Sequence, residues 1–372
     1  MRLRHIAATT VALGVAACGG QESADGTPPP TESRVVNVYN WPDYIAPGLI
    51  EQFEAETGIK VNYSTFEGNE VLETKLLTGN SGYDIVVPSA SFLQRQVEAG
   101  AYQPLDRTRL SSYGNLDPDM MAMLARNDPG NRHAIGYMWG TTGIGYDTRR
   151  VAALLPDAPT DSWRLVFDPA VAARLAACGI AFIDAPSEIL AVTLLSLGKD
   201  PYSEDPADLA AAETALMAIR PYVRYVNTVP LLEDLATGNV CVAVIWNGDV
   251  VRARLRSREA KLDSDIRYVI PAEGTLSWFD AMAIPGDAPH PDAAHAFIDF
   301  MLRADVAAKN ANLVRYATFN RAALPLLDAQ MTSDPAIYPA PEARARLHAM
   351  QPRSLEQTRA ENRIWTRFRT GQ

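Results

Sequence analysis

The chain has 372 residues, with 34 Lys and Arg against 44 Asp and Glu, which gives a formal net charge of −10. A hydrophobic fraction of 47% excludes a wholly disordered chain, and the length suits two compact units or one large one. The acidic balance argues against a nucleic-acid-binding protein, because such a protein needs a basic surface.

The N-terminus predicts an export signal. Residues 1–18 read MRLRHIAATTVALGVAAC, in which Arg2 and Arg4 precede an uncharged, mostly apolar run too short to span a bilayer. Small residues precede Cys18, as in lipoprotein signal sites, so we predict a lipoprotein signal peptide that ends at a lipidated Cys18. The alternative is ordinary signal cleavage nearby, with loss of Cys18. Residues 19–33 are rich in Gly, Pro, Ser and Thr and predict a flexible linker.

Two cysteines, Cys178 and Cys241, remain after this processing. An even pair in an exported protein predicts a disulfide, and the alternative is two buried free thiols. The bridge would close a loop of about 60 residues and stabilise the fold by roughly 4 kcal/mol. No later apolar run approaches the length of a membrane span, so we expect a soluble body outside the cytoplasm.

From residue 35 onward, short β-rich runs alternate with helical patterns. The predicted strands are 35–39, 59–63, 84–87, 179–183, 240–246 and 280–285. The predicted helices are 47–57, 69–77, 89–99, 170–177, 187–197, 206–219 and 291–302. Such alternation predicts an α/β fold, in which two lobes each contain a mostly parallel sheet flanked by helices.

Signatures of catalysis and cofactor binding are missing from the sequence. It contains no phosphate-binding glycine-rich loop, no nucleophile elbow and no histidine pair at zinc-binding spacing. The five histidines are scattered, and we interpret them as structural or surface residues. We therefore predict that the protein is not an enzyme and uses no cofactor or metal.

Aromatic and acidic residues recur together where the predicted strands and helices end. These residues are Trp41, Asp43, Tyr44, Glu188, Trp246, Asp249, Trp278, Asp280 and Tyr316. Each could be an ordinary core aromatic or a solvated acid. Ligands of open α/β sheets bind at the carboxyl ends of strands, so together these residues predict one cleft. Aromatic faces attract cations and cover methylenes, and carboxylates pair with ammonium groups, so the cleft suits an alkylammonium ligand.

Several longer motifs resemble one family. The runs VYNWPDYIAP (38–47), FEAETGIKV (53–61), DIVVPSASFL (84–93), YMW (137–139), TTGIGY (141–146) and IDAP (183–186) resemble the polyamine-binding proteins of bacterial ABC importers, in particular the putrescine-binding type. The resemblance extends from about Val35 to the C-terminus. It implies a two-lobed periplasmic binding protein of type II. The N-terminal lobe would comprise residues 34–138 and 280–330, and the C-terminal lobe residues 139–279 and 331–372.

The resemblance also implies a set of binding residues. The matching positions are Trp41, Pro42, Asp43, Tyr44, Ser89, Glu188, Trp246, Asp249, Trp278, Asp280 and Tyr316, with Ser91, Thr228 and Met350 nearby. Trp41, Tyr44 and Trp246 would sandwich the methylene chain. Asp280 would hold one ammonium group, with Asp249 and Glu188 near the other. The cysteines of this family that match Cys178 and Cys241 are bridged as well.

Some positions depart from the putrescine type. Pro42 replaces the usual Ser or Thr, and Trp278 replaces a phenylalanine and resembles the spermidine type, whereas Asp43, Ser91 and Ala185 match the putrescine type. A misfitting methylene is worth only about 1–3 kcal/mol, so one aromatic exchange could change the preferred amine.

We predict a periplasmic, lipid-tethered monomer that captures putrescine between its lobes and delivers it to the permease of an ABC transporter. The alternative ligands are spermidine, cadaverine and agmatine, and the alternative partner is a signalling receptor. An amino-acid ligand would need an arginine for its carboxylate, and none of the implied positions is Arg. A further alternative is a hydrolase that uses Asp249 and Asp280 as general acid and base. The tryptophans between these two residues suit a cationic ligand better than they suit hydrolysis.

Overall fold

The computed structural model describes residues 34–372. The predicted signal peptide, the lipidation of Cys18 and the linker to residue 33 lie outside the described residues. Between residues 34 and 372, no helix combines the length and the apolar character that crossing a bilayer requires.

The strands form two connected groups. The strands are β1 (Val35–Asn40), β2 (Lys60–Thr65), β3 (Ile85–Val86), β4 (Ala134–Asp147), β5 (Ile180–Phe182), β6 (Val223–Val226), β7 (Val242–Trp246), β8 (Ile266–Val269), β9 (Thr275–Ala283), β10 (Ala317–Thr318) and β11 (Leu347–Ala349). They follow the order β2-β1-β3-β9-β4-β7-β5-β6, with β8 and β10 paired to β4 and β11 paired to β9.

The helices that flank these strands are α1 (Leu49–Thr57), α2 (Asn69–Thr78), α3 (Ala90–Glu98), α4 (Pro118–Leu124), α5 (Thr148–Leu154), α6 (Arg164–Phe167), α7 (Pro169–Leu175), α8 (Pro186–Ser196), α9 (Pro206–Ile219), α10 (Leu231–Thr237), α11 (Asn247–Glu259), α12 (Pro291–Met301), α13 (Ala304–Val314), α14 (Ala329–Thr332), α15 (Pro341–Arg344) and α16 (Leu355–Thr370). All the helices and strands expected from the sequence are present, with bounds that differ at their ends.

Parallel pairing explains why helices alternate with strands. β1 pairs in parallel with β2 and β3, and β5 pairs in parallel with β6 and β7. A parallel strand needs a crossover connection, which α1 supplies from β1 to β2 and α2 supplies from β2 to β3 on the other side of β1. The predicted α/β class is confirmed, and the antiparallel pairs of β4 with β7, β8 and β9 make the sheet mixed.

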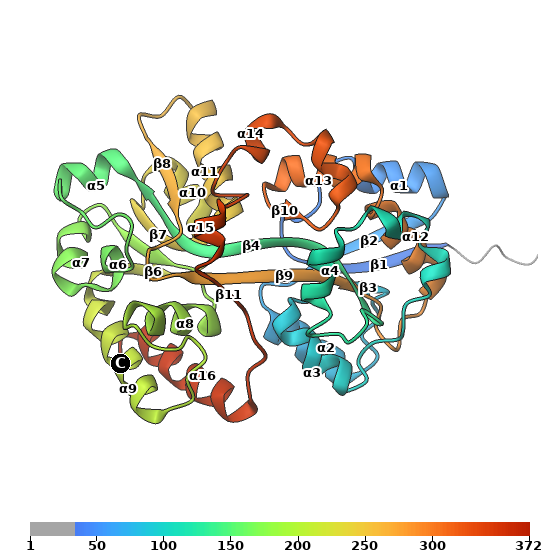
Figure 1. Ribbon diagram of the computed structural model, residues 1–372, viewed down its shortest axis with the longest axis horizontal. Coiled ribbons are helices and arrows are strands. Elements are labelled where there is room, and N and C mark those ends of the chain that lie inside the picture. The colour runs from blue at the N-terminus through green and yellow to red at the C-terminus, as the bar shows by residue number, and fades with distance from the viewer. Residues whose placement is uncertain (1–33) are drawn as a thin grey trace, which may run out of the picture. The chain divides into compact units, whose positions relative to one another are not determined.

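Two long strands connect the two groups. Residues 134–141 of β4 pair antiparallel with β9, whereas residues 142–147 pair with β7 and β8. In Figure 1, β4 and β9 run side by side from the region of α4 and α12 to the region of α5 and α6. The C-terminal helix α16 packs against α8 and α9.

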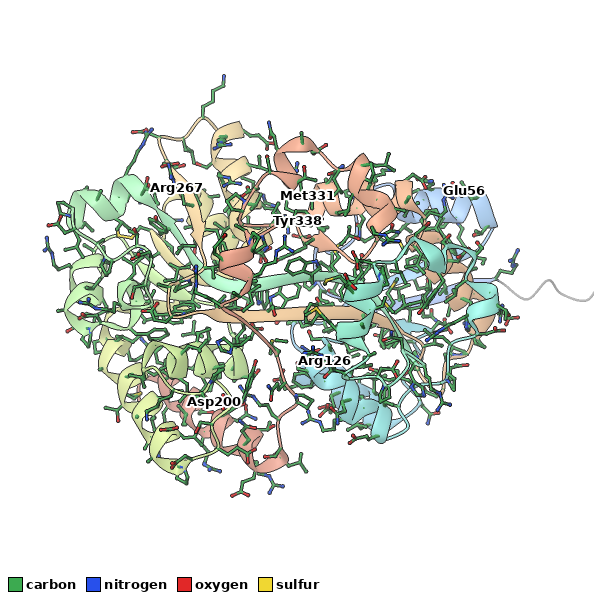
Figure 2. The ribbon with its side chains drawn as sticks, viewed as in Figure 1. Glu56, Arg126, Asp200, Arg267, Met331 and Tyr338 are labelled. Atoms are coloured by element: carbon green, nitrogen blue, oxygen red, sulfur yellow. A yellow bond between two sulfur atoms is a disulfide. The ribbon has the colours of Figure 1, made fainter. Side chains whose placement is uncertain are left out.

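Each group has its own hydrophobic core. One core draws residues from 36–138 and 278–319, and the other draws residues from 144–276 and 364–368. A third, smaller cluster joins Val251 on α11 to Ala307 and Ala311 on α13 and to Met331, and Tyr338 packs against it (Figure 2). The predicted boundaries at residues 138/139, 279/280 and 330/331 stay a prediction.

One helix starts later than the sequence suggests. The predicted helix 47–57 begins at Leu49, so Pro47 is not in its first turn. Gly48 has φ 81°, a left-handed conformation that interrupts the helix before Leu49. The other end is as expected, because Gly58 adopts φ 68° and its amide caps the carbonyl of Glu54.

The predicted disulfide between Cys178 and Cys241 is present and joins residues 63 positions apart, with 5.4 Å between the Cα atoms. Cys241 precedes β7 and is fully buried, while Cys178 lies between α7 and β5. The bridge therefore links the starts of two neighbouring parallel strands.

Candidate ligand-binding site

Carboxyl ends of strands position much of the predicted site. Trp41 follows β1, Trp246 ends β7, and the first turns of α8 and α11 carry Glu188 and Asp249. Trp278 and Asp280 lie on β9, one of the two strands that connect the cores. Trp246 packs against both large cores, which places this cluster where they meet.

Asp280 is a buried carboxylate held by two hydroxyl groups. It is 5% exposed, and it accepts hydrogen bonds from Ser89 Oγ at 2.6 Å and from the Tyr44 hydroxyl at 2.8 Å. Asn69 Nδ2 donates to Ser89 Oγ at 3.0 Å, which leaves the serine proton for Asp280. The pKa of Asp280 is raised to about 7, mainly by burial and also by the charge of Glu188, although the two hydroxyl groups lower it.

Glu188 is the second carboxylate of this kind. Its Oε2 accepts hydrogen bonds from Trp246 Nε1 at 3.0 Å and from the hydroxyl of Thr142. Burial raises the pKa of Glu188 to about 7, and the nearby charge of Glu70 adds to this effect. Within residues 34–372, neither Glu188 nor Asp280 forms a salt bridge.

Asp43 and Asp249 differ, because an arginine lies between them. Arg252 forms an ion pair with Asp43 at 2.9 Å and lies 3.7 Å from Asp249. The side chain of Asp43 is 67% exposed, whereas that of Asp249 is only 17% exposed. Burial raises the pKa of Asp249, although the charge of Arg252 and a hydrogen bond from Tyr316 lower it. Asp249 is therefore partly neutralised by the protein itself.

Aromatic rings pack in two groups beside these carboxylates. The ring centroids of Trp41 and Trp246 are 6.4 Å apart, those of Tyr44 and Tyr316 are 5.6 Å apart, and those of Tyr316 and Trp278 are 5.2 Å apart. Trp41 Nε1 donates to the carbonyl of Val87 at 2.9 Å, which fixes that indole ring. These rings offer apolar and π-rich surface beside Asp280 and Glu188.

The packing of the Tyr316 ring requires a glycine at position 248. A Cβ atom at Gly248 would lie 2.5 Å from the Tyr316 ring, so only glycine lets the ring pack at this position. The indole nitrogen of Trp278 is buried and has no hydrogen-bond partner among residues 34–372.

Four of the predicted residues lie at the margin of this cluster or outside it. Pro42 is exposed, and Thr228 Oγ1 accepts from the backbone amide of Asp184 at 2.9 Å. Ser91 and Met350 line a cavity between α2, α3, α8 and α16, and Glu70 lines it as well. The buried Ser91 Oγ has no partner in the described part of the chain.

Sequence reasoning missed several residues of the cluster. These are Asn69, Glu70, Thr142 and Arg252. Arg252 follows Asp249 at helical i,i+3 spacing, and that pattern is a signal that could have revealed it. Thr142 stands in the TTGIGY run (141–146), which carries the resemblance, but no role was assigned to it. Asn69 and Glu70 stand in no motif, and their role depends on contacts between distant parts of the chain.

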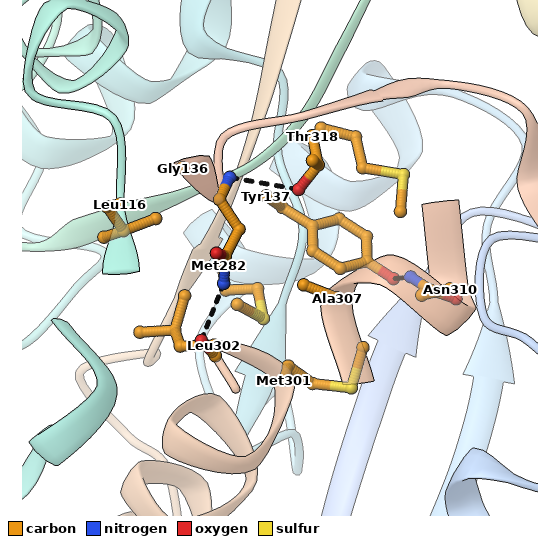
Figure 3. A pocket seen from close by; sticks show the side chains of 11 residues that line it. Leu116, Gly136, Tyr137, Met282, Met301, Leu302, Ala307, Asn310 and Thr318 are labelled. Carbon is orange, nitrogen blue, oxygen red and sulfur yellow. Dashed lines mark hydrogen bonds between the residues drawn. The ribbon is translucent and has the colours of Figure 1, made fainter. Parts of the chain in front are cut away.

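A second small cavity lies elsewhere in the first core (Figure 3). Its lining includes Tyr137, Met282, Met301 and Asn310, and none of the predicted ligand-binding residues line it. It is therefore separate from the carboxylate cluster. From residue 34 to 372, no group of three His, Cys, Asp or Glu side chains is arranged to hold a metal ion.

Comparison with known proteins gives the family. Residues 48–340 match the family model described as bacterial extracellular solute-binding protein. The chain belongs to this family. Its members are substrate-binding transport proteins and not enzymes, which confirms the prediction that the protein is not an enzyme.

Curated relatives match nearly the whole chain. The putrescine-binding periplasmic protein SpuD of Pseudomonas aeruginosa (strain UCBPP-PA14) is 45% identical over 350 residues, which cover 94% of this chain and 95% of SpuD. The putrescine-binding periplasmic protein PotF of Escherichia coli K12 is 44% identical over 342 residues, 91% of this chain and 92% of PotF.

A solved structure confirms the fold. The spermidine/putrescine substrate-binding protein PotD of Streptococcus pneumoniae has a TM-score of 0.74 and 31% identity, covering 91% of this chain and 99% of PotD. The predicted two-lobed type II binding-protein fold is therefore confirmed.

Proposed function

We propose that the protein captures putrescine in the periplasm and delivers it to the permease of an ABC transporter. The observation that carries this proposal is the pair of buried carboxylates, Asp280 and Glu188, that accept hydrogen bonds only from uncharged donors among the described residues. A buried carboxylate without a cation is costly, and the charge of Glu188 adds to this cost by raising the pKa of Asp280. A ligand with two ammonium groups relieves both.

The aromatic rings explain why a flexible aliphatic diamine fits. The faces of Trp41 and Trp246 cover methylene groups and attract the adjoining ammonium groups, at about 0.5–2 kcal/mol for each cation contact. One ammonium binds Asp280, and the other binds near Glu188 and Asp249. The relatives SpuD and PotF, which are named putrescine-binding periplasmic proteins, support the periplasmic location. The solved PotD, which is named an ABC transporter substrate-binding protein, supports the permease as the partner.

Spermidine is the second candidate, and Trp278 is the observation that favours it. Trp278 is a larger ring than the phenylalanine expected of a putrescine-type site, and its buried N–H group has no partner in residues 34–372. Spermidine/putrescine-binding proteins are also relatives, such as one of Escherichia coli K12 that is 35% identical over 338 residues.

The last part of the proposal concerns how the protein is attached to the membrane. We propose that the exported protein is a monomer held at the membrane by a lipid on Cys18, as the signal-like sequence suggests. Mass spectrometry of the N-terminal peptide from membranes of the producing bacterium tests this, since a diacylglyceryl group on Cys18 supports it and an unmodified downstream N-terminus refutes it.

Isothermal titration calorimetry with putrescine, cadaverine, agmatine and spermidine tests the ligand. The proposal expects the tightest binding for putrescine. 4-Aminobutyrate serves as the matched control, because its carboxylate would face a buried carboxylate of the site, and it should give no heat. Heat from none of the four amines would refute the proposal, and tighter binding of spermidine would favour the second candidate.

A further inference from the structure

The segment that carries Tyr44 has no regular secondary structure between β1 and α1. Asp43 and Gly48 within it both have positive φ angles, of 54° and 81°. Such a segment is not held by helix or sheet hydrogen bonds, so its position depends on contacts with the rest of the protein. Yet Tyr44 is only 4% exposed, and its hydroxyl donates to Asp280 at 2.8 Å.

Two buried side chains hold this segment through hydrogen bonds to its main chain. Asn310 on α13 is fully buried, and its Oδ1 accepts from the backbone amide of Ala46 at 2.7 Å. Asn310 Nδ2 donates to the Tyr137 hydroxyl at 2.7 Å, and that hydroxyl donates to the carbonyl of Tyr44 at 2.5 Å. Figure 3 shows the Tyr137 hydroxyl and the Asn310 amide pointing toward one another.

The donors and acceptors of this chain of hydrogen bonds fit in one direction only. Because the Asn310 oxygen accepts from Ala46, its amide nitrogen faces Tyr137 as a donor. The single proton of the Tyr137 hydroxyl is then left for the Tyr44 carbonyl. The Tyr137 ring also packs edge-on against the Tyr44 ring, with centroids 5.2 Å apart. Every contact in the series constrains Tyr44.

We propose that Asn310 and Tyr137 are positioning residues for ligand recognition, which hold the main chain of residues 44–46 so that the Tyr44 hydroxyl orients the carboxylate of Asp280. Neither residue belongs to the predicted binding set, and both line the separate cavity of Figure 3. The affinity part of this inference rests on the proposed function, because putrescine is its probe.

The titration of Asp280 tests the inference without a ligand. The hydrogen bond from Tyr44 lowers the pKa of Asp280, and the other groups that act on it are Ser89 and Glu188. Tyr137→Phe leaves Ser89 and Glu188 in place and removes one oxygen atom. The carboxyl-carbon NMR signal of Asp280, assigned by its loss in Asp280→Asn, should titrate at higher pH in Tyr137→Phe than in the wild type. An unchanged titration would overturn the inference.

Binding provides the second readout. Tyr137→Phe should weaken putrescine binding about tenfold, the value of one well-placed hydrogen bond. In a Tyr44→Phe background the same change should cost no more than about twofold, because its effect passes through the Tyr44 hydroxyl. Full additivity of the two changes would contradict the inference.

Tyr102→Phe is the matched control. Tyr102 is 6% exposed, belongs to the same core and donates to Gln96 Oε1 at 2.6 Å, so its loss also removes a buried hydroxyl. It should alter neither the titration of Asp280 nor the affinity. Asn310→Ala gives the same two readouts where Tyr137→Phe folds poorly. Failure of the wild type to bind putrescine would refute the proposed function alone, since the Asp280 titration still decides the inference.

Discussion

Replacement of Asp280 by asparagine should make the ligand-free protein more stable while it abolishes binding. Asp280 is 5% exposed, and burial raises its pKa from 3.8 to about 7. Between these pH values the folded protein retains a proton that the unfolded chain has released, so the free energy of unfolding falls as the pH rises. Above pH 7 the folded protein bears the full cost of the buried charge.

The size of the effect follows from the size of the shift. A rise from 3.8 to about 7 corresponds to roughly 4 kcal/mol at most, at about 1.4 kcal/mol for each pH unit. Asparagine is neutral at every pH, and its amide oxygen still accepts from Tyr44. We therefore expect Asp280→Asn to raise the melting temperature at pH 8 by on the order of 5 °C. The difference should shrink as the pH approaches 4, where the wild-type carboxyl group is neutral too.

Scanning calorimetry at pH 5 and pH 8 without ligand measures the stability, and titration calorimetry measures the binding. Loss of one partner of a buried ion pair should weaken putrescine binding by roughly a hundredfold or more. Asp128→Asn is the control, because Asp128 is fully buried but accepts from the backbone amides of His133 and Ala134, and its loss should destabilise the protein. A melting temperature of Asp280→Asn below that of the wild type at pH 8 would refute the reasoning.

Because burial raises the pKa values of Asp280 and Glu188 to about 7, putrescine binding should strengthen from pH 6 to pH 8 and should release protons near pH 6.5. Calorimetry in buffers of different ionisation enthalpy detects this release, and an affinity independent of pH would contradict the prediction. Trp246→Phe keeps a ring but removes the N–H donor to Glu188, so titration should show about tenfold weaker binding, and an unchanged affinity would oppose the assignment. Replacing Cys178 and Cys241 together with serine should lower the free energy of unfolding in urea by about 4 kcal/mol yet leave the affinity unchanged, and equal stability would count against the loop-entropy argument.

The local pattern of the sequence was enough to predict most of the fold. Strand β1 and helices α2, α9 and α12 lie within one or two residues of their predicted bounds, because alternation of apolar residues and caps such as Gly58 are local signals. The start of α1 was wrong, since the left-handed conformation of Gly48 is set by the loop that carries Tyr44.

The long strands were not predictable in the same way. Residues 134–147 form one strand that pairs with β9 along its first half and with β7 and β8 along its second half. The glycines in this stretch weaken any local strand signal. A Cβ atom at Gly136 would lie 2.0 Å from the ring of Phe319, so the reason for this glycine lies in a residue far along the chain.

In the binding site, too, some residues could be predicted from local sequence patterns and others could not. The carboxylates and aromatic rings at strand ends could be proposed from the sequence, because chain direction alone places the carboxyl ends together. The hydroxyl donors and anchors could not. Asn69 acts on Asp280 through Ser89, and Asn310 holds Ala46 across a separation of 264 residues. Only the folded chain brings these groups into contact.

Asp280 and Glu188 have no cationic partner among residues 34–372, and we expect them to bind the two ammonium groups of one linear diamine. Titration calorimetry of putrescine and n-butylamine at pH 8 tests this expectation most directly, since the two amines share a four-carbon chain and differ by one ammonium group. We predict that butylamine binds at least about a hundredfold more weakly, because one buried carboxylate is left without an ammonium partner. Equal affinity for the two amines would contradict it.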